Sequence, residues 1–301
     1  MTHTTTARLP ADASSPASSP QGRFDGRLGG IALVLGGAFS VQFGSAVAAL
    51  AFPIAGALGV VMLRISIAAV LLILVARPRL RDYSRADLGT AALFGLALGG
   101  MNIFFYLAIE RIPIGLAVTL EVLGPLALSV IVSRRGLSLV WAGLALGGVF
   151  LLGQGGIGDL DLVGAGFALA AAAMWACYIV FSSRTGARFP KLDGLALAMV
   201  VASLVSLPLG IGSAGSALLD PVVLGFGAAV AVLSSGVPYA LELLALRRLP
   251  KSTFSVLMSL APAIGALAGF LVLGQTLSWT QCLAIVLVIA ASAGAVRTGK
   301  A

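Results

Sequence analysis

Long apolar runs separated by short polar breaks dominate this sequence. Each run holds roughly 16 to 23 residues, and about 20 residues of α-helix are needed to cross the hydrocarbon core of a bilayer. Ten such runs lie near 29–50, 54–76, 88–109, 114–133, 138–154, 162–183, 194–212, 222–246, 252–273 and 278–296. The runs predict an all-α, polytopic membrane protein with ten transmembrane helices.

The composition also argues against a soluble fold. Only 10% of the residues are charged and 59% are hydrophobic, whereas soluble domains carry about 25% charged residues. Residues 1–28 contain no apolar core and are rich in Ser, Pro, Ala and Thr, so we expect a disordered polar tail there. Two five-helix units, 29–155 and 162–297, would follow the tail.

The basic residues predict how the chain crosses the membrane. All 19 lysines and arginines except Arg64 and Arg111 fall in the terminal segments or in alternate breaks between runs. The positive-inside rule therefore predicts that both termini are cytoplasmic. The net charge of +8 is then a topology signal, with anionic lipid rather than nucleic acid as its partner.

A short pattern occurs twice at a fixed spacing. Leu-Ala-x-x-Arg-x-Pro begins at Leu107 and again at Leu244, 137 residues later, and a further proline follows each copy, Pro125 and Pro262. Five spans in each half is an odd number, so the second half would enter the membrane inverted. Inverted repeats are typical of carriers that rock one half against the other.

Three charged residues, Arg64, Glu121 and Glu242, fall well inside predicted spans, where charge is expensive and functional by default. Arg64 and Glu121 each lie 13 residues before a cytoplasmic arginine, Arg77 and Arg134, which puts both about 20 Å from the inner boundary. Glu121 is a candidate proton or substrate-ammonium site; the alternative is a static ion pair with Arg64. Arg64 would either neutralise Glu121 or bind a substrate carboxylate. Glu242 is shallower and fits a structural pair with the basic cytoplasmic residues.

Two predicted helix breaks occupy corresponding positions in the two halves. They are Gly124-Pro125 and Ala261-Pro262. Paired interruptions in inverted halves are the best sequence indicator of a central binding site, although proline kinks also occur without such a role. Other polar or aromatic groups expected to face an interior, as substrate contacts or as helix–helix contacts, are Gln42, Asn102, Tyr106, Trp175, Tyr178 and Tyr239. Small-residue packing seams are predicted at Gly95-x-x-x-Gly99, Gly143-x-x-x-Gly147 and Gly265-x-x-x-Gly269.

The residues needed for most catalytic or metal chemistry are missing from the sequence. Its one histidine, His3, lies in the tail, and the two cysteines, Cys177 and Cys282, have no CxxC spacing. We therefore expect no enzyme activity, no metal and no cofactor.

Several strings of residues resemble amino-acid exporters of the EamA-type branch of the drug/metabolite transporter superfamily, from about residue 29 to 296. The strings are Gly99-Gly100-Met101-Asn102, Leu120-Glu121, Gly124-Pro125-Leu126-Ala127, Ser133-Arg134-Arg135, Pro238-Tyr239, Leu241-Glu242 and Arg248-Leu249-Pro250. Glu121 and Glu242 match the family's carboxylates in the fourth and eighth helices. Where the family usually reads Met-Glu-Pro and Gly-Glu, this chain has Leu260-Ala261-Pro262 and Gly274-Gln275, which leaves Glu121 as the main candidate.

The resemblance implies a bacterial inner-membrane carrier built from two inverted five-helix bundles. It implies efflux of small hydrophilic amino acids such as threonine and homoserine by proton antiport with alternating access. Expected partners are small-molecule amino acids, protons and the lipid bilayer, with a homodimer left open. Two alternatives are an EamA-type exporter of another metabolite or drug, and a non-transporting membrane partner protein.

Overall fold

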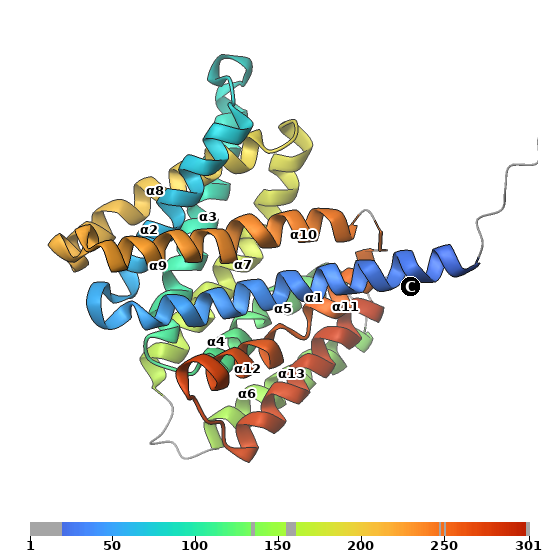
Figure 1. The fold of residues 1–301 in the computed structure, drawn as a ribbon. Coiled ribbons are helices and arrows are strands. Elements are labelled where there is room, and N and C mark those ends of the chain that lie inside the picture. Colours follow the sequence, from blue (N-terminus) through green and yellow to red (C-terminus); the bar gives the residue numbers. More distant parts are fainter. Residues whose placement is uncertain (1–19, 134–135, 155–160, 247, 250, 299–301) are drawn as a thin grey trace, which may run out of the picture.

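The computed structural model describes residues 20–133, 136–154, 161–246, 248–249 and 251–298, and within these residues it is helical throughout (Figure 1). The first half contains α1 (Pro20–Leu50), α2 (Phe52–Ala76), a short 3₁₀ turn η1 (Leu80–Asp82), α3 (Arg85–Ile109), α4 (Ile114–Glu121), α5 (Leu123–Ser133) and α6 (Gly136–Gln154). The second half contains α7 (Leu162–Arg188), α8 (Asp193–Ala214), η2 (Gly215–Leu219), α9 (Pro221–Ala231), η3 (Val232–Gly236), α10 (Val237–Leu246), α11 (Lys251–Met258), α12 (Ala261–Leu273) and α13 (Trp279–Thr298).

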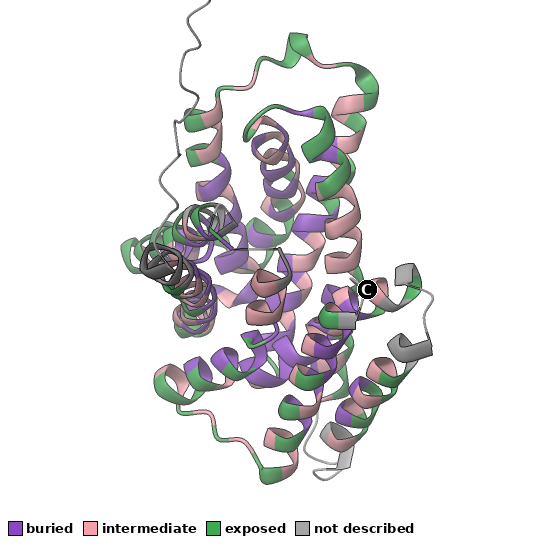
Figure 2. Ribbon diagram, turned by 90° about the vertical axis from the view of Figure 1, so that its right-hand side faces the viewer, coloured by how far each residue is buried: buried purple, intermediate pink, exposed green. Residues whose placement is uncertain are grey.

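The helices have the lengths that a bilayer requires. Seven helical segments of the described chain are long and apolar enough to cross a membrane, and three shorter apolar segments are Ile114–Ser129, Val140–Leu151 and Pro221–Gly236. Large apolar side chains such as Val75, Phe150 and Phe270 are exposed. Figure 2 shows exposed residues along the outer sides of the helices. An apolar outer surface is what lipid contact demands, so the chain is a membrane protein. The first helix begins at Pro20, before the apolar run that starts near residue 29. Residues 1–19 are not among the described residues.

Helices of the first half pack mainly on helices of the second. In particular, α1 contacts α10 and α12, α2 contacts α8 and α9, α3 contacts α7 and α8, α4 contacts α12 and α7, and α6 contacts α13. Figure 1 shows α1 running beside α10, and α13 beside α6. The helices of the two halves therefore pack directly against each other.

Glycines permit the closest of these approaches. A Cβ at Gly95 would meet the backbone of Ala198, a Cβ at Gly99 would lie 3.1 Å from Ala202 Cα, and Gly115 faces Ala266 in the same way. The seam predicted at Gly95 and Gly99 is therefore a helix contact. The prediction for Gly143 and Gly147 was wrong, because nothing lies within 4 Å of a Cβ at either position.

Polar residues begin the helices at the membrane edges. Ser84 and Asp87 form a reciprocal capping box at the start of α3, and the Asp161 carboxylate accepts from the backbone N–H groups of Val163 and Gly164 at the start of α7. Asp220 caps α9 in the same manner. Such caps pair backbone donors that a helix start otherwise leaves unbonded.

Candidate functional site

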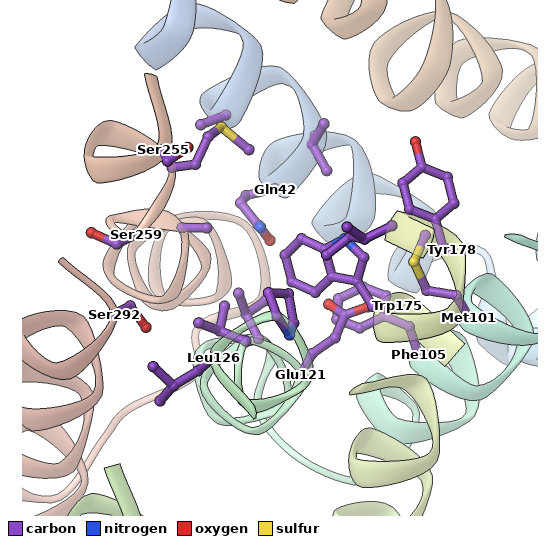
Figure 3. Close-up of a pocket in the computed structure, with 18 of the residues that line it drawn as sticks. Gln42, Met101, Phe105, Glu121, Leu126, Trp175, Tyr178, Ser255, Ser259 and Ser292 are labelled. Carbon is purple, nitrogen blue, oxygen red and sulfur yellow. The ribbon is translucent and has the colours of Figure 1, made fainter. Parts of the chain in front are cut away.

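A cavity of about 540 Å³ lies where the two halves meet (Figure 3). Its walls come from helices of both halves, and most of its lining atoms are apolar. The polar side chains at its wall are those of Gln42, Ser45, Arg64, Asn102, Glu121, Ser129, Trp175, Tyr178, Ser234, Ser255, Ser259 and Ser292. Six of the residues singled out from sequence are thus gathered around one space: Gln42, Arg64, Asn102, Glu121, Trp175 and Tyr178.

Arg64 is a buried cation held by neutral acceptors. Its side chain on α2 is only 9% exposed. One terminal nitrogen donates to the Tyr106 hydroxyl at 3.2 Å and the other donates to the carbonyl oxygen of Ser234 at 3.1 Å. The guanidinium also lies 5.5 Å from the centre of the Tyr106 ring, within the range of a cation–π contact. These contacts fix the group and leave its charge without a bonded carboxylate.

Tyr106 therefore has a different place from the one expected. It is fully buried and does not line the cavity. It reaches the site through Arg64, and its ring also lies 5.8 Å from Phe52. Its position is that of a support for the arginine.

The Ser234 carbonyl oxygen that accepts from Arg64 lies where the helix winding changes. Residues Val232–Gly236 form a π-helical turn, η3, between α9 and α10. Two of its carbonyl oxygens accept side-chain donors: Leu233 accepts from Ser40 at 2.6 Å and Ser234 accepts from Arg64. Single π-helical turns inside α-helices frequently mark functional sites. Sequence reasoning missed Ser234; the Ser-Ser-Gly string inside an apolar run was the available signal.

Glu121 ends α4 and points into the cavity from the side opposite the serine-lined wall (Figure 3). Among the described residues, its carboxylate has no hydrogen bond and no ion pair. Arg64 lines the same cavity, but among the described residues no ion pair joins its guanidinium to the Glu121 carboxylate. The static Arg64–Glu121 pair considered from sequence is therefore not formed in this structure.

Both predicted helix breaks lie at the cavity. In the first half α4 ends at Glu121 and α5 begins at Leu123, with Pro125 in the wall. In the second half α11 ends at Met258 and α12 begins at Ala261, so that Pro262 occupies the first turn of α12. Gly124 faces away from the cavity and packs against the backbone of Ala172 on α7.

The remaining residues predicted to face the interior differ in their hydrogen bonding and packing. Asn102 donates to the carbonyl of Leu98 within its own helix at 2.9 Å. The Tyr178 ring packs 5.2 Å from Phe94. Gln42 is 7% exposed, and its Oε1 has no hydrogen-bond partner. Tyr239 and Glu242 lie on α10, but their side chains are outside the described residues, so these two predictions remain untested.

The cavity reaches the last turns of α13. The part of α13 that lines it, Ser292 to Val296, adjoins the basic Arg297 at the end of that helix. At the other end α4 is sealed, because residues 114–120 are all buried and Gly115 lies against Ala266.

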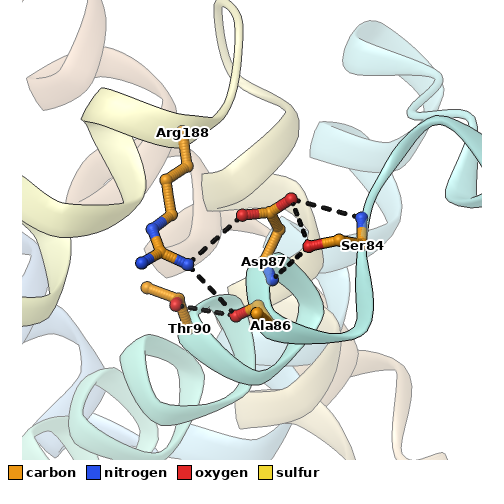
Figure 4. Close-up of polar contacts among 5 residues, drawn as sticks. All are labelled: Ser84, Ala86, Asp87, Thr90 and Arg188. Atoms are coloured by element: carbon orange, nitrogen blue, oxygen red, sulfur yellow. Dashed lines mark hydrogen bonds and ion pairs between the residues drawn. The ribbon is translucent and has the colours of Figure 1, made fainter.

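Polar contacts tie the start of α3 to the end of α7. Arg188 forms an ion pair with Asp87 at 3.3 Å (Figure 4), and Ser84 donates to the same carboxylate. Nearby, the Tyr83 hydroxyl donates to Asp193, and this bond raises the pKa of Tyr83 to about 12.

One ion pair joins the two halves at the opposite end. Arg111 contacts Asp161 at 3.1 Å. The backbone N–H of Gly164 and the Arg111 guanidinium both donate to Asp161, and together they lower the pKa of that carboxyl. Within the described ranges of the chain, no cluster of metal-binding side chains occurs.

Comparison with known proteins gives a consistent result. A family model described as the EamA-like transporter family matches residues 162–297. The threonine/homoserine exporter RhtA of Salmonella typhimurium (strain LT2) is 42% identical over 86% of this chain and 88% of its own length. The same exporter of Escherichia coli (strain K12) is 41% identical over 89% and 91%.

The fold also has a counterpart among crystal structures. One solved protein superimposes with a TM-score of 0.55, covering 92% of this chain and 98% of its own, at 19% identity. At that identity the likeness concerns the fold alone. The proteins that resemble this chain in sequence are transporters and not enzymes, and together with its apolar helices they make it a multi-pass protein of the bacterial inner membrane. This chain belongs to the EamA-like transporter family, alongside the threonine/homoserine exporters.

Proposed function

We propose that this protein exports small hydrophilic amino acids of the threonine/homoserine kind, by proton antiport with alternating access. One observation carries the proposal. A single cavity between the two halves holds a buried guanidinium and a carboxylate that are not bonded to each other. These are the two charges that would complement the carboxylate and ammonium of an amino acid, in a chain 42% identical to threonine/homoserine exporters.

For the architecture, we propose ten spans in two inverted five-helix repeats with both termini in the cytoplasm. The packing supports this, since α2 contacts α8 and α6 contacts α13; each pair would be one helix and its repeat mate. Ser66 Oγ and Ser203 Oγ are 2.8 Å apart and separated by 137 residues, the same spacing as the sequence repeat. A residue that touches its own equivalent is expected on a two-fold axis.

The substrate would bind with its carboxylate on Arg64 and its ammonium on Glu121. Arg64 has five N–H donors and uses two on neutral acceptors, so the rest can meet a carboxylate in a charge-assisted bond. Trp175 and Tyr178 border the Glu121 side of the cavity (Figure 3). Asn102 and Gln42 would supply further polar contacts at the wall.

Coupling to protons would follow from competition at Glu121. With the cavity open outward, the carboxylate takes a proton; after the protein turns inward it releases the proton and binds a substrate ammonium instead. Because one carboxylate cannot hold both, each outward passage of substrate requires an inward passage of a proton. The absence of an acid at Ala261 leaves Glu121 as the carboxylate for this exchange.

The cavity supports an inward-facing state for this conformation. It extends toward the basic ends of the helices, which the positive-inside rule assigns to the cytoplasm. The opposite end is closed by α4 and α12 at Gly115 and Ala266. Turning outward would separate that contact and close the serine-lined wall.

A second candidate is efflux of a larger metabolite or drug. The apolar lining favours it, in particular Phe105, Trp175 and Met101 around Glu121 (Figure 3). A cavity of about 540 Å³ has room for a ligand larger than threonine. The two charged groups would then be needed only for the proton.

The test uses inside-out vesicles that contain the purified protein and an imposed proton gradient. Uptake of labelled threonine and homoserine, compared with a panel of other amino acids and aromatic drugs, identifies the substrate class. We expect uptake of both hydroxy amino acids that collapses on addition of a protonophore. Drug uptake without amino-acid uptake would favour the second candidate, and gradient-independent threonine uptake would exclude antiport.

A further inference from the structure

Gln42 is a buried polar group whose oxygen the protein leaves unbonded. It lies on α1, is 7% exposed and lines the cavity, and within the part of the chain that the structure describes its Oε1 accepts no hydrogen bond. Asn102, the other carboxamide in the wall, donates to its own helix. An unpaired buried amide oxygen costs free energy, so an unpaired one in a binding cavity indicates a ligand group that completes it.

The position of the amide places it near Glu121. A Cβ at Gly265 would lie 3.3 Å from Gln42 Oε1 and 3.2 Å from Val118 Cγ2, so the amide oxygen lies against Gly265 of α12, in the same neighbourhood as the Val118 side chain of α4. Val118 and Glu121 are three residues apart and share a helix face. In Figure 3 Gln42 lies between the wall that carries Ser255, Ser259 and Ser292 and the wall that carries Glu121 and Trp175.

The chemistry of a carboxamide matches a hydroxyl. Its oxygen accepts and its nitrogen donates, while a hydroxyl does both, so the match holds whichever way the amide is turned. A substrate with a methyl group in place of the hydroxyl would leave the buried amide without a hydrogen-bond partner. Sites built to bond a substrate hydroxyl therefore reject analogues that lack it.

We propose that Gln42 determines specificity by binding the side-chain hydroxyl of the transported amino acid, and so selects hydroxy amino acids over apolar ones of the same size. This rests on the proposed function, in which Arg64 and Glu121 hold the two charges attached to the substrate Cα. The hydroxyl is then the one polar group that still needs a partner. In threonine it is on Cβ and in homoserine on Cγ, and the three side-chain torsions of glutamine allow its amide to reach both.

Two other unpaired hydroxyls at the cavity fit this role less well. Ser234 Oγ lies against Gly44, where it fills the contact between α1 and η3. Ser292 Oγ is on α13, across the cavity from Glu121 (Figure 3). Gln42 is the unpaired group that combines burial with a place beside α4.

The experiment measures selectivity in inside-out vesicles. Uptake of labelled threonine is inhibited with unlabelled threonine, valine or alanine, because valine has nearly the shape of threonine without its hydroxyl. We expect valine to inhibit at least about tenfold less well than threonine in the wild type. In Gln42→Met the difference between inhibition by threonine and inhibition by valine should fall to within about threefold. Alanine, which carries the same charges, should inhibit the wild type and Gln42→Met equally well.

Thr119→Val is the matched control. Thr119 is a buried hydroxyl on α4, bonded to the carbonyl of Gly115 and absent from the cavity wall, so its loss should leave the threonine-to-valine difference at the wild-type value. A wild-type difference retained in Gln42→Met would overturn the inference and leave the proposed function standing. Absence of threonine uptake by the wild type would instead refute the proposed function.

A second variant covers the case in which Gln42→Met does not fold. Gln42→Asn keeps the amide and shortens its reach by one carbon. In Gln42→Asn we expect unlabelled threonine to lose inhibitory strength relative to unlabelled homoserine, compared with the wild type. The reason is that the hydroxyl of homoserine extends one carbon further and can still meet the shortened side chain. An unchanged ratio of the two amino acids would count against a contact between Gln42 and the hydroxyl.

Discussion

Substituting Gly124 by alanine should disturb the cavity through the helix behind it. A Cβ at this position would lie 2.6 Å from the carbonyl carbon of Ala172, 3.0 Å from its Cα and closer still to its oxygen. Carbon atoms in contact are about 3.5–4.0 Å apart, so α7 would have to move by roughly 1 Å. Overpacking of this kind costs about 1–3 kcal/mol.

The movement would reach the site because α7 also carries Trp175 and Tyr178. Misplacement of about 1 Å can reduce activity by about 100-fold. We expect Gly124→Ala to unfold about 2–10 °C below the wild type and to transport threonine at least about tenfold more slowly. Thermal unfolding of the purified protein and initial uptake rates measure the two effects.

Gly143→Ala is the matched control, since nothing lies within 4 Å of a Cβ at Gly143 on α6. Alanine is favoured over glycine inside a helix by about 1 kcal/mol, so this variant should be as stable as the wild type or slightly more so. If Gly124→Ala behaved like Gly143→Ala in both assays, the contact between Gly124 and α7 would not constrain the cavity.

Three further predictions concern the charged and capping groups. Arg64→Met should abolish threonine uptake but change the unfolding temperature by less than about 3 °C, because no carboxylate of the described residues is bonded to Arg64. Breaking a buried ion pair would instead cost about 3–5 kcal/mol and lower the unfolding temperature by a larger amount. Asp161→Ala should lower stability at pH 7, and because the pKa of Asp161 is lowered in the fold, the difference should disappear as pH falls below its ordinary value of 3.8 in thermal scans at several pH values. Tyr83→Phe should destabilise below pH 10, and the difference should vanish as pH rises through the raised pKa of about 12; a difference that persists above it would refute the bond to Asp193.

The sequence was sufficient to predict which charges share a space. Arg64 and Glu121 lie at equal depth in two different apolar runs. Because a charged side chain avoids lipid, both are expected to face the same protein interior. The paired interruptions at Pro125 and Pro262 follow from the missing proline N–H, and both lie at the cavity. These inferences need only spacing and the cost of charge in lipid.

Contacts across helices were beyond sequence reasoning. Arg64 is bonded to Tyr106 and to the carbonyl of Ser234, and the second acceptor lies in the π-helical turn η3, which nothing in the sequence pattern indicates. Helix rotation explains why Gly143 and Gly147 have open space on their Cβ side, while Gly148 meets the backbone of Ala284. Spacing shows that glycines share a face and does not show which face meets a neighbour.

The role of Glu121 in proton coupling is the central claim, and proton movement coupled to threonine tests it most directly. In inside-out vesicles with a pH-sensitive dye trapped inside, antiport by the wild type should make the lumen more alkaline when threonine is added outside. Glu121→Gln, which keeps the size and removes the charge, should give no such change even though the protein folds. A wild-type alkaline shift in Glu121→Gln would contradict the account.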